Sequence, residues 1–262
     1  MGSDLPKVSV VFVTYNRMVT LRPTLESFLR HTDYPRDRLE LIVTDDGSPP
    51  AVQSDIRNMP FDVFCLSDRR SGLGANTNRG LAAATGDFVL QLQDDWSCEG
   101  PADYLVKAVG ILSARPDIGL LILNTHIQPL ASGGRFDHEG WDVRVFAPGP
   151  QLSADGVEWF AYSDWPHLKR QDFIRHVGPY LEGRPMWETE IDFGRRVARQ
   201  DRYGIADFAS LTVFRHIGEA HSYNWPWKKR VESWITRLPG GEMAMRLYRR
   251  YKRGGARRVS EG

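Results

Sequence analysis

The stretch LELIVTDDGS, residues 39–48, joins an apolar, β-branched run to the adjacent carboxylates Asp45 and Asp46. The same placement recurs where the apolar run 88–90 leads into Asp94 and Asp95. Adjacent carboxylates repel each other, so two such pairs at strand ends predict that cations or hydrogen-bond donors are held there. In open α/β sheets ligands bind at the carboxyl ends of the strands, which is where both pairs are expected.

Apolar runs alternate with helical periodicity through the first half of the chain. Continuous apolar runs are typical of buried parallel strands, and apolar residues at helical spacing indicate the helices between them. Repeated strand–helix units predict an α/β fold with a mostly parallel sheet and right-handed crossovers. The expected strands are 8–13, 39–44, 61–66, 87–92, 118–123 and 208–214, and the expected helices start near Leu21 and after Pro50 and cover 73–84, 104–113 and 188–199.

The segment from Asn124 to Asp164 is rich in glycine, proline and aromatic residues, which predicts loops over a substrate cleft. Tryptophans are frequent in the second half of the chain. We expect most of them in the core, with a sugar-stacking platform as the alternative. They are Trp141, Trp159, Trp165, Trp187, Trp225 and Trp227.

The composition is that of a soluble globular protein: 262 residues, 41% hydrophobic and 26% charged. A net charge of +1 argues against nucleic acid as a partner. Cys65, which we expect in the core, and Cys98 are too few for a disulfide framework, which favours a reducing compartment. The sequence shows neither a signal peptide nor about 18 consecutive apolar residues, so we expect a cytoplasmic protein.

Three loops carry the candidate chemistry. Residues 14–17, TYNR, follow the first strand, where the tyrosine can stack on a base; the alternative is a turn and helix cap. Asp45 and Asp46 open a plausible tight turn, although a turn does not need two carboxylates. Asp94 and Asp95 project from the end of a central strand, where carboxylates suit a hard divalent cation; an exposed charged turn is the alternative.

Together these loops resemble those of the GT-A glycosyltransferases, specifically the inverting, nucleotide-sugar-dependent enzymes of family 2. The motifs that carry the resemblance are VSVVFVTYNR at 8–17, VTDDGS at 43–48, Gly72–Gly80 with Asn78, and GDF at 86–88 leading into Asp94 and Asp95. The resemblance implies a Rossmann-like GT-A fold. Within it, residues 1–100 would form the nucleotide-sugar-binding half, 101–235 the acceptor-binding and catalytic half, and 236–262 a basic C-terminal tail.

The resemblance also implies roles for individual residues. A nucleoside-diphosphate sugar of the UDP, dTDP or GDP type would be bound by Thr14, Tyr15, Arg17, Asp45, Asp46, Asn78 and Asp94. Mg²⁺ or Mn²⁺ would be held by Asp95 and by His216, for which His221 is a rival. Two positions depart from the family pattern: Gln93 stands where a carboxylate usually opens the acidic triplet, and Thr77 where relatives often carry an arginine. Arg69, Arg70 or Arg79 would then supply that arginine's contact.

The stretch WETEIDF, residues 187–193, resembles the place where the family carries its catalytic base. Glu190 is the candidate, with Glu188 and Asp192 as rivals, because a carboxylate within hydrogen-bond reach of the acceptor hydroxyl can take its proton. The alternative is a helix N-terminus that carries acids to suit its dipole. By resemblance, the reaction is a hexosyl transfer by a single displacement with inversion.

Two other functions are weighed against this one. A sugar nucleotidyltransferase should carry a glycine- and lysine-rich loop after the first strand, and residues 14–17 offer none. A nucleotide-sugar-binding module without catalysis is conceivable because of Gln93 and Thr77, but the retained Asp94, Asp95 and Glu190 argue against it.

Residues 242–258 mix arginines with apolar side chains. This pattern is typical either of a solvated terminus or of a basic helix in peripheral contact with the inner face of a membrane. The second interpretation favours a lipid-linked acceptor over another glycan or a small molecule.

Overall fold

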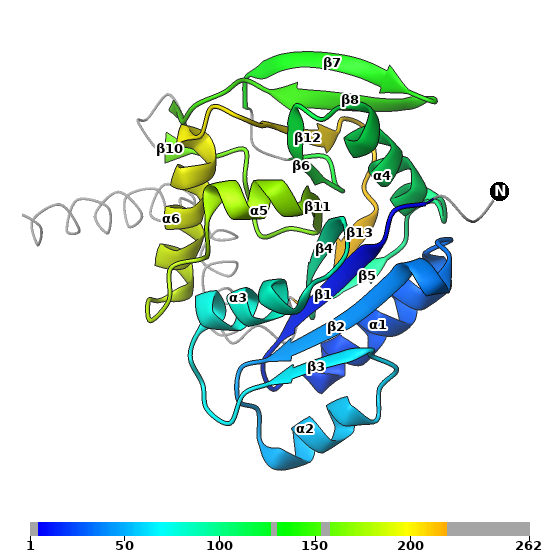
Figure 1. Ribbon diagram of the computed structural model, residues 1–262, viewed down its shortest axis with the longest axis vertical. Coiled ribbons are helices and arrows are strands. Elements are labelled where there is room, and N and C mark those ends of the chain that lie inside the picture. The colour runs from blue at the N-terminus through cyan, green and yellow to red at the C-terminus, as the bar shows by residue number, and fades with distance from the viewer. Residues whose placement is uncertain (1–4, 127–129, 153–157, 219–262) are drawn as a thin grey trace, which may run out of the picture. The chain divides into compact units, whose positions relative to one another are not determined.

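The computed structural model describes residues 5–126, 130–152 and 158–218 (Figure 1). The chain divides into two units, residues 1–217 and 218–262, and the architecture below is that of the first unit. The expected basic tail, His221 and the tryptophans at 225 and 227 lie outside the described residues.

A nine-stranded sheet with the order β3-β2-β1-β4-β11-β6-β12-β8-β7 forms the centre of this unit (Figure 1). Strands β11 and β8 run antiparallel to both their neighbours, while β3, β2, β1, β4, β6 and β12 share one direction, as the predicted mostly parallel sheet requires. The strands are β1 Val8–Thr14, β2 Leu39–Asp45, β3 Val63–Leu66, β4 Phe88–Gln93, β6 Ile118–Ile122, β7 Ser132–His138, β8 Trp141–Phe146, β11 His167–Arg170 and β12 Gly204–Phe208. Two small ladders pair β5 Trp96–Cys98 with β13 Phe214–His216, and β9 Gln151–Leu152 with β10 Glu158–Trp159.

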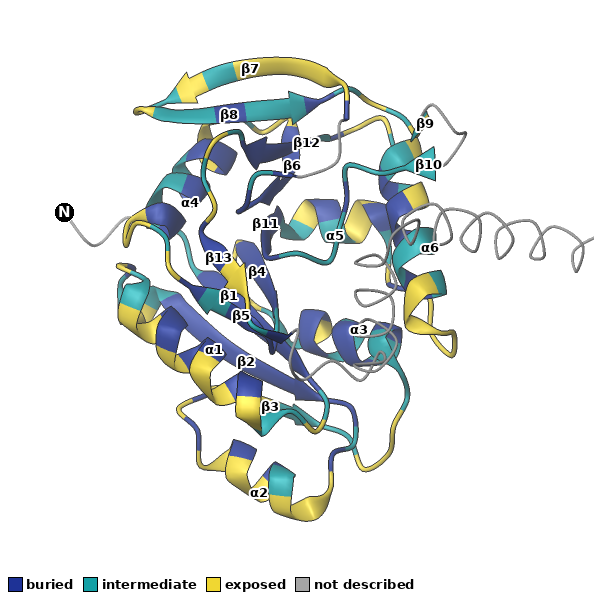
Figure 2. Ribbon diagram, turned by 180° about the vertical axis from the view of Figure 1, so that it is seen from behind, coloured by how far each residue is buried: buried dark blue, intermediate teal, exposed yellow. Residues whose placement is uncertain are grey.

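Helices cover both faces of the sheet, because side chains of the central strands alternate between two cores. On β1, Val10 and Phe12 enter one core and Val11 and Val13 the other. Figure 2 shows the central strands buried and the outer faces of the helices exposed. The first core is covered by α1 Met18–His31, α2 Pro50–Arg57 and α4 Tyr104–Ala114, and the second by α3 Leu73–Ala83, α5 Gln171–Val177 and α6 Met186–Arg199.

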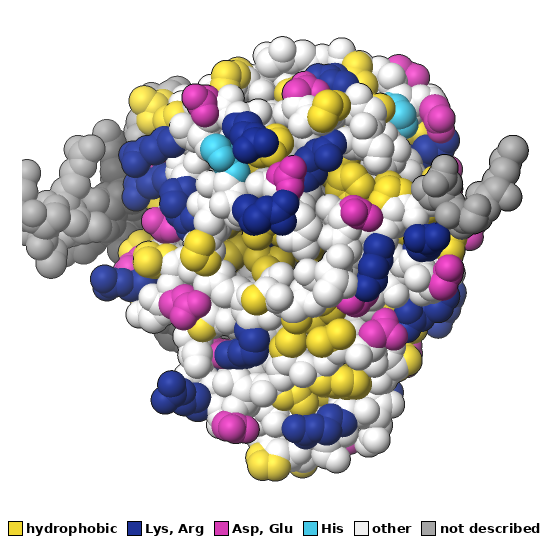
Figure 3. Space-filling view, in the orientation of Figure 1, with side chains coloured by type: hydrophobic (Ala, Val, Ile, Leu, Met, Phe, Trp, Pro, Cys, Tyr) yellow, Lys and Arg dark blue, Asp and Glu magenta, His cyan; other side chains and the backbone are white. Residues whose placement is uncertain are grey.

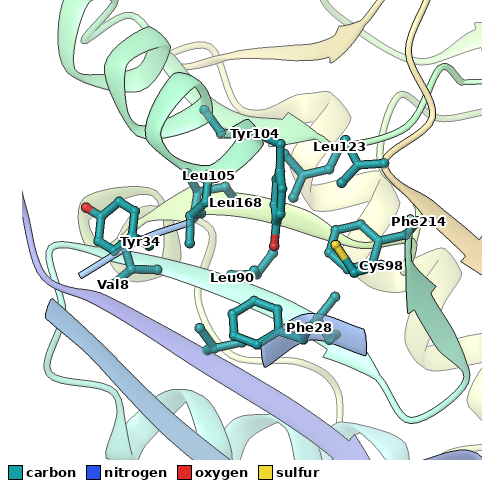
Figure 4. Close-up of a cluster of buried hydrophobic side chains, with 14 of the residues drawn as sticks. Val8, Phe28, Tyr34, Leu90, Cys98, Tyr104, Leu105, Leu123, Leu168 and Phe214 are labelled. Atoms are coloured by element: carbon teal, nitrogen blue, oxygen red, sulfur yellow. The ribbon is translucent and has the colours of Figure 1, made fainter. Parts of the chain in front are cut away.

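The first core also fixes the β5–β13 ladder. In Figure 4, Phe28 of α1, Tyr104 of α4 and Phe214 of β13 point into one cluster with Leu90 of β4 and Cys98 of β5. The rings of Tyr104 and Phe214 meet edge to face at 5.5 Å. Each large apolar side chain buried here contributes about 1.5–3 kcal/mol. The packing therefore holds the segment that follows β4 in a fixed position.

Several sequence-based expectations are wrong in detail. The expected strand 208–214 is two elements: β12 ends at Phe208, and the chain crosses to β13 only at Phe214. Between them only an isolated antiparallel bridge joins Thr212 to Asn124, whose side chain accepts from the amides of Val213 and Phe214 at 3.0 and 2.9 Å. The expected loops at 124–164 include the hairpin of β7 and β8, and β11 and α5 were not expected. Cys65 is half-buried rather than a core residue.

Of the described tryptophans expected in the core, Trp187 is 60% exposed, while Trp141, Trp159 and Trp165 are partly buried against the two cores. Figure 3 shows basic side chains interspersed with acidic ones on one face of the molecule. Within the described ranges, no helix combines the length and apolar character needed to span a bilayer.

Candidate active site

The carboxyl ends of three neighbouring strands bring the predicted loops together. Strand β1 pairs with β2 on one side and with β4 on the other, so the loops after Thr14, Asp45 and Gln93 leave the same edge of the sheet. The Thr14 hydroxyl donates to Oδ2 of Asp94 at 2.6 Å. The amide of Asp46 donates to the Thr14 carbonyl at 3.2 Å. The two acidic pairs therefore lie on either side of the end of β1.

Arg17 joins the second acidic pair. Its Nη1 lies 3.0 Å from Oδ1 of Asp94 and 2.9 Å from Oδ2 of Asp95. Burial raises the pKa of Asp94 to about 7 against the opposing effects of Arg17 and Thr14. Burial also acts to raise the pKa of Asp95, but the hydrogen bond with His216 and the charge of Arg17 lower it overall. The pair is thus held together by one buried guanidinium.

His216 reaches the same carboxylate from the β5–β13 ladder, where it lies opposite Trp96. Its Nε2 is 3.2 Å from Oδ2 of Asp95, and its ring lies 5.1 Å from that of Trp96. The other oxygen of Asp95, Oδ1, is buried and has no hydrogen-bond partner in the structure. A carboxylate oxygen and an imidazole nitrogen are suitable ligands for Mn²⁺. Among the described residues no three His, Cys, Asp or Glu side chains form such a group, so this part of the chain offers at most two such ligands here.

The carboxylates of the first acidic pair, Asp45 and Asp46, bind to different parts of the chain. Asp45 is fully buried and accepts from the Ser48 amide at 2.8 Å and from Gln53 Nε2 at 2.9 Å, so its carboxylate is engaged in the turn. Asp46 accepts from the amides of Ser71 and Gly72 at 2.8 and 2.9 Å and thereby fixes the loop after β3. Arg70 of that loop approaches both Asp46 and the ring of Tyr15, so Asp46 is the member of the pair on the Tyr15 side.

Arg70 is the arginine that meets the first loop. Its guanidinium lies 4.5 Å from the centroid of the Tyr15 ring, and its Nε lies 4.0 Å from Oδ2 of Asp46. Arg79 instead donates to the Asp45 carbonyl at 3.2 Å. Arg69 lines a cavity of about 720 Å³ together with Ser71, Ala75, Asn78, Arg79, Glu182 and Gly183.

Asn78 ties α3 to the loop before α6. Its amide nitrogen donates to the Tyr180 carbonyl at 2.9 Å and to Glu182 Oε1 at 2.7 Å, and its oxygen accepts from the Tyr180 amide at 2.8 Å. Thr77, on the same helix, is buried. Asn78 thus faces the 720 Å³ cavity while holding one of its walls.

The three candidate bases differ in their surroundings. Asp192 is ion-paired with Arg196 at 2.9 Å, and Arg196 also donates to the carbonyl of Val177 at 2.7 Å, which gives this pair a structural role. Glu188 is half-buried in the first turn of α6. Burial raises the pKa of Glu190 to about 8, and the neighbouring carboxyl of Asp164 acts in the same direction. Such a carboxylate is suited to proton transfer near neutral pH.

Asp164 was missed by the sequence analysis. It lies in an aromatic-rich segment before β11 and shares a hydrogen bond with Glu190. Sequence offers no signal for it, because the two carboxyl groups come from separate elements and meet only in the folded chain.

Part of the chain is similar to known glycosyltransferases. Residues 9–117 match the family model described as Glycosyl transferase family 2. The chain is 36% identical over 96 residues to the GalNAc(5)-diNAcBac-PP-undecaprenol beta-1,3-glucosyltransferase of Campylobacter jejuni, covering 35% of this chain and 30% of that protein. The similarity to this relative therefore spans less than a third of the relative's length.

Solved structures share the fold at low sequence identity. S. aureus TarS in complex with UDP-GlcNAc aligns with a TM-score of 0.57 and 18% identity over 83% of this chain and 61% of that chain. The mannosyltransferase PcManGT from Pyrobaculum calidifontis, in complex with GDP-Man and Mn²⁺, aligns with a TM-score of 0.51 and 18% identity over 78% and 57%. These likenesses support the predicted GT-A fold.

Proposed function

We propose, from the match of residues 9–117 to the family model described as Glycosyl transferase family 2, that the chain transfers a sugar from a nucleoside-diphosphate sugar to an acceptor hydroxyl. The observation that carries the proposal is the group formed by Thr14, Arg17, Asp94, Asp95 and His216 at one edge of the sheet. This group places a guanidinium, two carboxylates and an imidazole at the carboxyl ends of the strands, which is where α/β proteins bind their ligands.

The nucleoside would lie between the first and second loops. Tyr15 offers an aromatic face, and Asp46 a carboxylate that can accept from the base or the ribose. Arg70, which covers the Tyr15 ring in the structure, would supply the contact that relatives make with the arginine replaced here by Thr77. Asp45 would act indirectly, because its carboxylate already holds the turn that presents Asp46.

A divalent cation, Mg²⁺ or Mn²⁺, would be held by Asp95 and His216. The unpartnered Oδ1 of Asp95 and the 3.2 Å approach of His216 Nε2 support this assignment, as does the Mn²⁺ in the mannosyltransferase neighbour. When bound, the cation would neutralise charge on the leaving diphosphate. Arg17 would add positive charge beside it, since its Nε and Nη2 are buried without hydrogen-bond partners in the structure.

Glu190 would draw the proton from the acceptor hydroxyl. The oxygen would then attack the anomeric carbon opposite the diphosphate, in a single displacement that inverts the anomeric configuration. The raised pKa of Glu190 supports this choice over Asp192, whose carboxylate is engaged with Arg196. For the acceptor we propose a glycan hydroxyl, and the undecaprenol-linked substrate in the Campylobacter relative's name makes a lipid-linked glycan the first to test.

A thermal-shift panel tests the proposal. UDP, dTDP, GDP and CDP are each added with and without Mn²⁺ to the wild type, to Asp95→Ala and to the control Asp55→Ala, which alters an exposed carboxylate on α2. A ligand at about 100 times its dissociation constant adds about 2.7 kcal/mol to the free energy of unfolding. For a protein of this size that corresponds to an increase in melting temperature of about 5–10 °C.

We expect one nucleotide to raise the melting temperature of the wild type and of Asp55→Ala, with a smaller effect in Asp95→Ala or without Mn²⁺. Release of that nucleoside diphosphate from its sugar conjugate then tests for catalysis. Binding without release in the presence of polyprenol-linked and free glycans would indicate a non-catalytic module. Absence of any shift would overturn the proposal.

A further inference from the structure

A lysine is fully buried in the middle of the sheet. Lys169 of β11 has no exposed surface, and its Nζ donates to Gln91 Oε1 on β4 at 2.7 Å and lies 3.5 Å from the Tyr180 hydroxyl. Burial lowers the pKa of Lys169 to about 7, and Asp164 opposes that effect. Because an isolated buried charge is costly, a lysine in this position calls for a compensating negative group.

Two tyrosines connect the lysine to a carboxylate. The hydroxyls of Tyr180 and Tyr162 are 2.6 Å apart, and the Tyr162 hydroxyl also bonds to Asp164. Both tyrosines are buried, with 2% and 5% of their surfaces exposed. Tyr180 also contacts Gln91 Oε1 at 3.2 Å, so the lysine and the tyrosines share one acceptor on β4. The result is a continuous hydrogen-bonded chain from the centre of the sheet to Asp164.

This hydrogen-bonded series of side chains ends at the candidate base, Glu190. Asp164 shares a hydrogen bond with Glu190, and Phe193, one turn further along α6, stacks on Tyr180 with the ring centroids 4.0 Å apart and the planes 7° apart. The same ring contacts Tyr162 at 4.8 Å. The tyrosines therefore contact α6 by packing and, through Asp164, reach Glu190 by hydrogen bonding.

Resting on the function proposed above, we propose that Asp164 is the positioning partner of the base Glu190, with which it shares one proton. Lys169, through Tyr180 and Tyr162, holds this carboxyl pair in its singly ionised form. Two carboxyl groups that share a hydrogen bond bind one proton between them more readily than they ionise together. A positive charge connected to the pair disfavours the fully protonated form.

The proton balance is simple. In the resting pair, the hydrogen bond raises the pKa of Glu190 and acts to lower that of Asp164, so Glu190 carries the shared proton. When the acceptor binds, this proton moves along the hydrogen bond to Asp164, which leaves Glu190 ionised. The acceptor hydroxyl gives its proton to Glu190 as its oxygen forms the bond to the anomeric carbon, and the electron pair of the broken bond leaves with the nucleoside diphosphate. The pair is then neutral, and it returns one proton to water after the products leave.

Several other charged groups around α6 have contacts of their own. Arg196 and Asp192 bind each other on the helix itself. On the elements packed against it, Arg79 of α3 bonds to the Asp45 carbonyl, Arg175 and Asp172 of α5 pair with each other, His176 of α5 packs on Tyr203, and Glu158 of β10 pairs with Arg195. Asp164 is therefore the charged group that acts most directly on Glu190.

The test is a ¹³C NMR titration of the full-length protein labelled at the glutamate side-chain carboxyl carbon, with the Glu190 resonance assigned by its loss in Glu190→Gln. It needs no substrate, so its result is independent of the nucleotide panel. In the wild type we expect the Glu190 resonance to titrate well above the ordinary glutamate value of about 4.3. In Asp164→Asn the midpoint should fall by about 1–2 pH units, because the like charge is lost.

Two further variants keep the test decisive if Asp164→Asn does not fold. Tyr162→Phe removes only the hydroxyl that bonds to Asp164 and should lower the Glu190 midpoint by a smaller amount. Lys169→Met should raise the pH at which the pair loses its first proton by about one unit. The control Asp192→Asn, on the same helix but paired with Arg196, should leave the midpoint unchanged. An ordinary Glu190 midpoint in the wild type, or midpoints unmoved in the folded variants, would overturn the proposal.

Discussion

Nη1 of Arg17 lies 3.0 Å from Oδ1 of Asp94, and the same nitrogen lies 2.9 Å from Oδ2 of the adjacent Asp95. One guanidinium, with its side chain 16% exposed, therefore compensates two buried carboxylates. Removing one member of a buried ion pair leaves the other charge without compensation, which costs far more than the pair itself contributes.

Arg17→Met should accordingly lower the free energy of unfolding by about 3–5 kcal/mol, measured by urea denaturation at pH 7. The exposed Arg22 on α1 provides the control, since Arg22→Met should change stability by no more than about 0.5 kcal/mol. Mn²⁺ should raise the melting temperature of Arg17→Met more than that of the wild type, because the freed carboxylates then bind the cation. Equal stability of the two arginine variants would contradict this account.

Gly47 allows the turn after Asp46 to pass close to the loop after β3. Its φ is +81°, and a Cβ there would lie 2.4 Å from the Arg69 carbonyl carbon. Gly47→Ala should therefore destabilise the protein by about 3 kcal/mol or more, and should weaken nucleotide binding by displacing Arg70. Gly140 is the control: its φ of +85° gives the same backbone strain, but nothing lies within 4 Å of its Cβ position, so a side chain there would not collide with other atoms. Gly140→Ala should cost only about 1–2 kcal/mol in the same denaturation experiment.

Glu40 makes the free energy of unfolding depend on pH in the acidic range. Burial alone would raise its pKa, but hydrogen bonds from Lys7, Ser9 and Thr85 lower it to about 2. A carboxyl whose pKa is depressed in the folded state stabilises the protein above its unfolded pKa, and this contribution is lost as the pH falls from about 4.5 toward 2. At pH 7 it amounts to about 2–3 kcal/mol.

Glu40→Gln should therefore lose less stability than the wild type between pH 7 and pH 3, as followed by urea denaturation at both values. Glu26→Gln, an exposed change on α1, should follow the wild type. A pH dependence of Glu40→Gln equal to that of the wild type would show that this carboxyl is not the group responsible.

Glu190→Gln should reduce kcat about 10²- to 10⁴-fold while leaving the affinity for the nucleotide unchanged, because the carboxylate acts on the acceptor hydroxyl. Asp192→Asn is the matched variant one half-turn away. It should keep most of the activity and lose about 0.5 kcal/mol of stability with its Arg196 pair. Steady-state kinetics and calorimetric nucleotide titration separate the two effects, and a larger kcat loss in Asp192→Asn would move the role of base to that residue.

The sequence predicts the part of the fold in which local pattern and tertiary environment agree. Strands β1, β2 and β4 are buried on both faces, so they read as continuous apolar runs and their carboxylates fall at the predicted edge. Strand β11 escapes prediction because its four residues include Lys169 and Arg170, and a buried lysine becomes acceptable only through Gln91 and Tyr180 from distant positions.

The missed parts of the site have the same cause. Nothing local indicates that Asp164 meets Glu190, or that Asp45 turns inward to Gln53 while Asp46 reaches the loop after β3. The shifted strand has a related explanation. Residues 209–213 have an apolar composition that suits a strand, but the segment forms only an isolated bridge between Thr212 and Asn124.

The position of β11 between β4 and β6 bears on how the chain folds during synthesis. Strands β1 to β4 find all their mutual partners within the first part of the chain, whereas the far edge of β4 is covered only when His167 pairs with Gln91. Until then a long, apolar strand edge stays open, and pairings of this sequence separation form slowly. Chains truncated before β11 should therefore be prone to aggregate, and the last step of sheet assembly should limit the refolding rate.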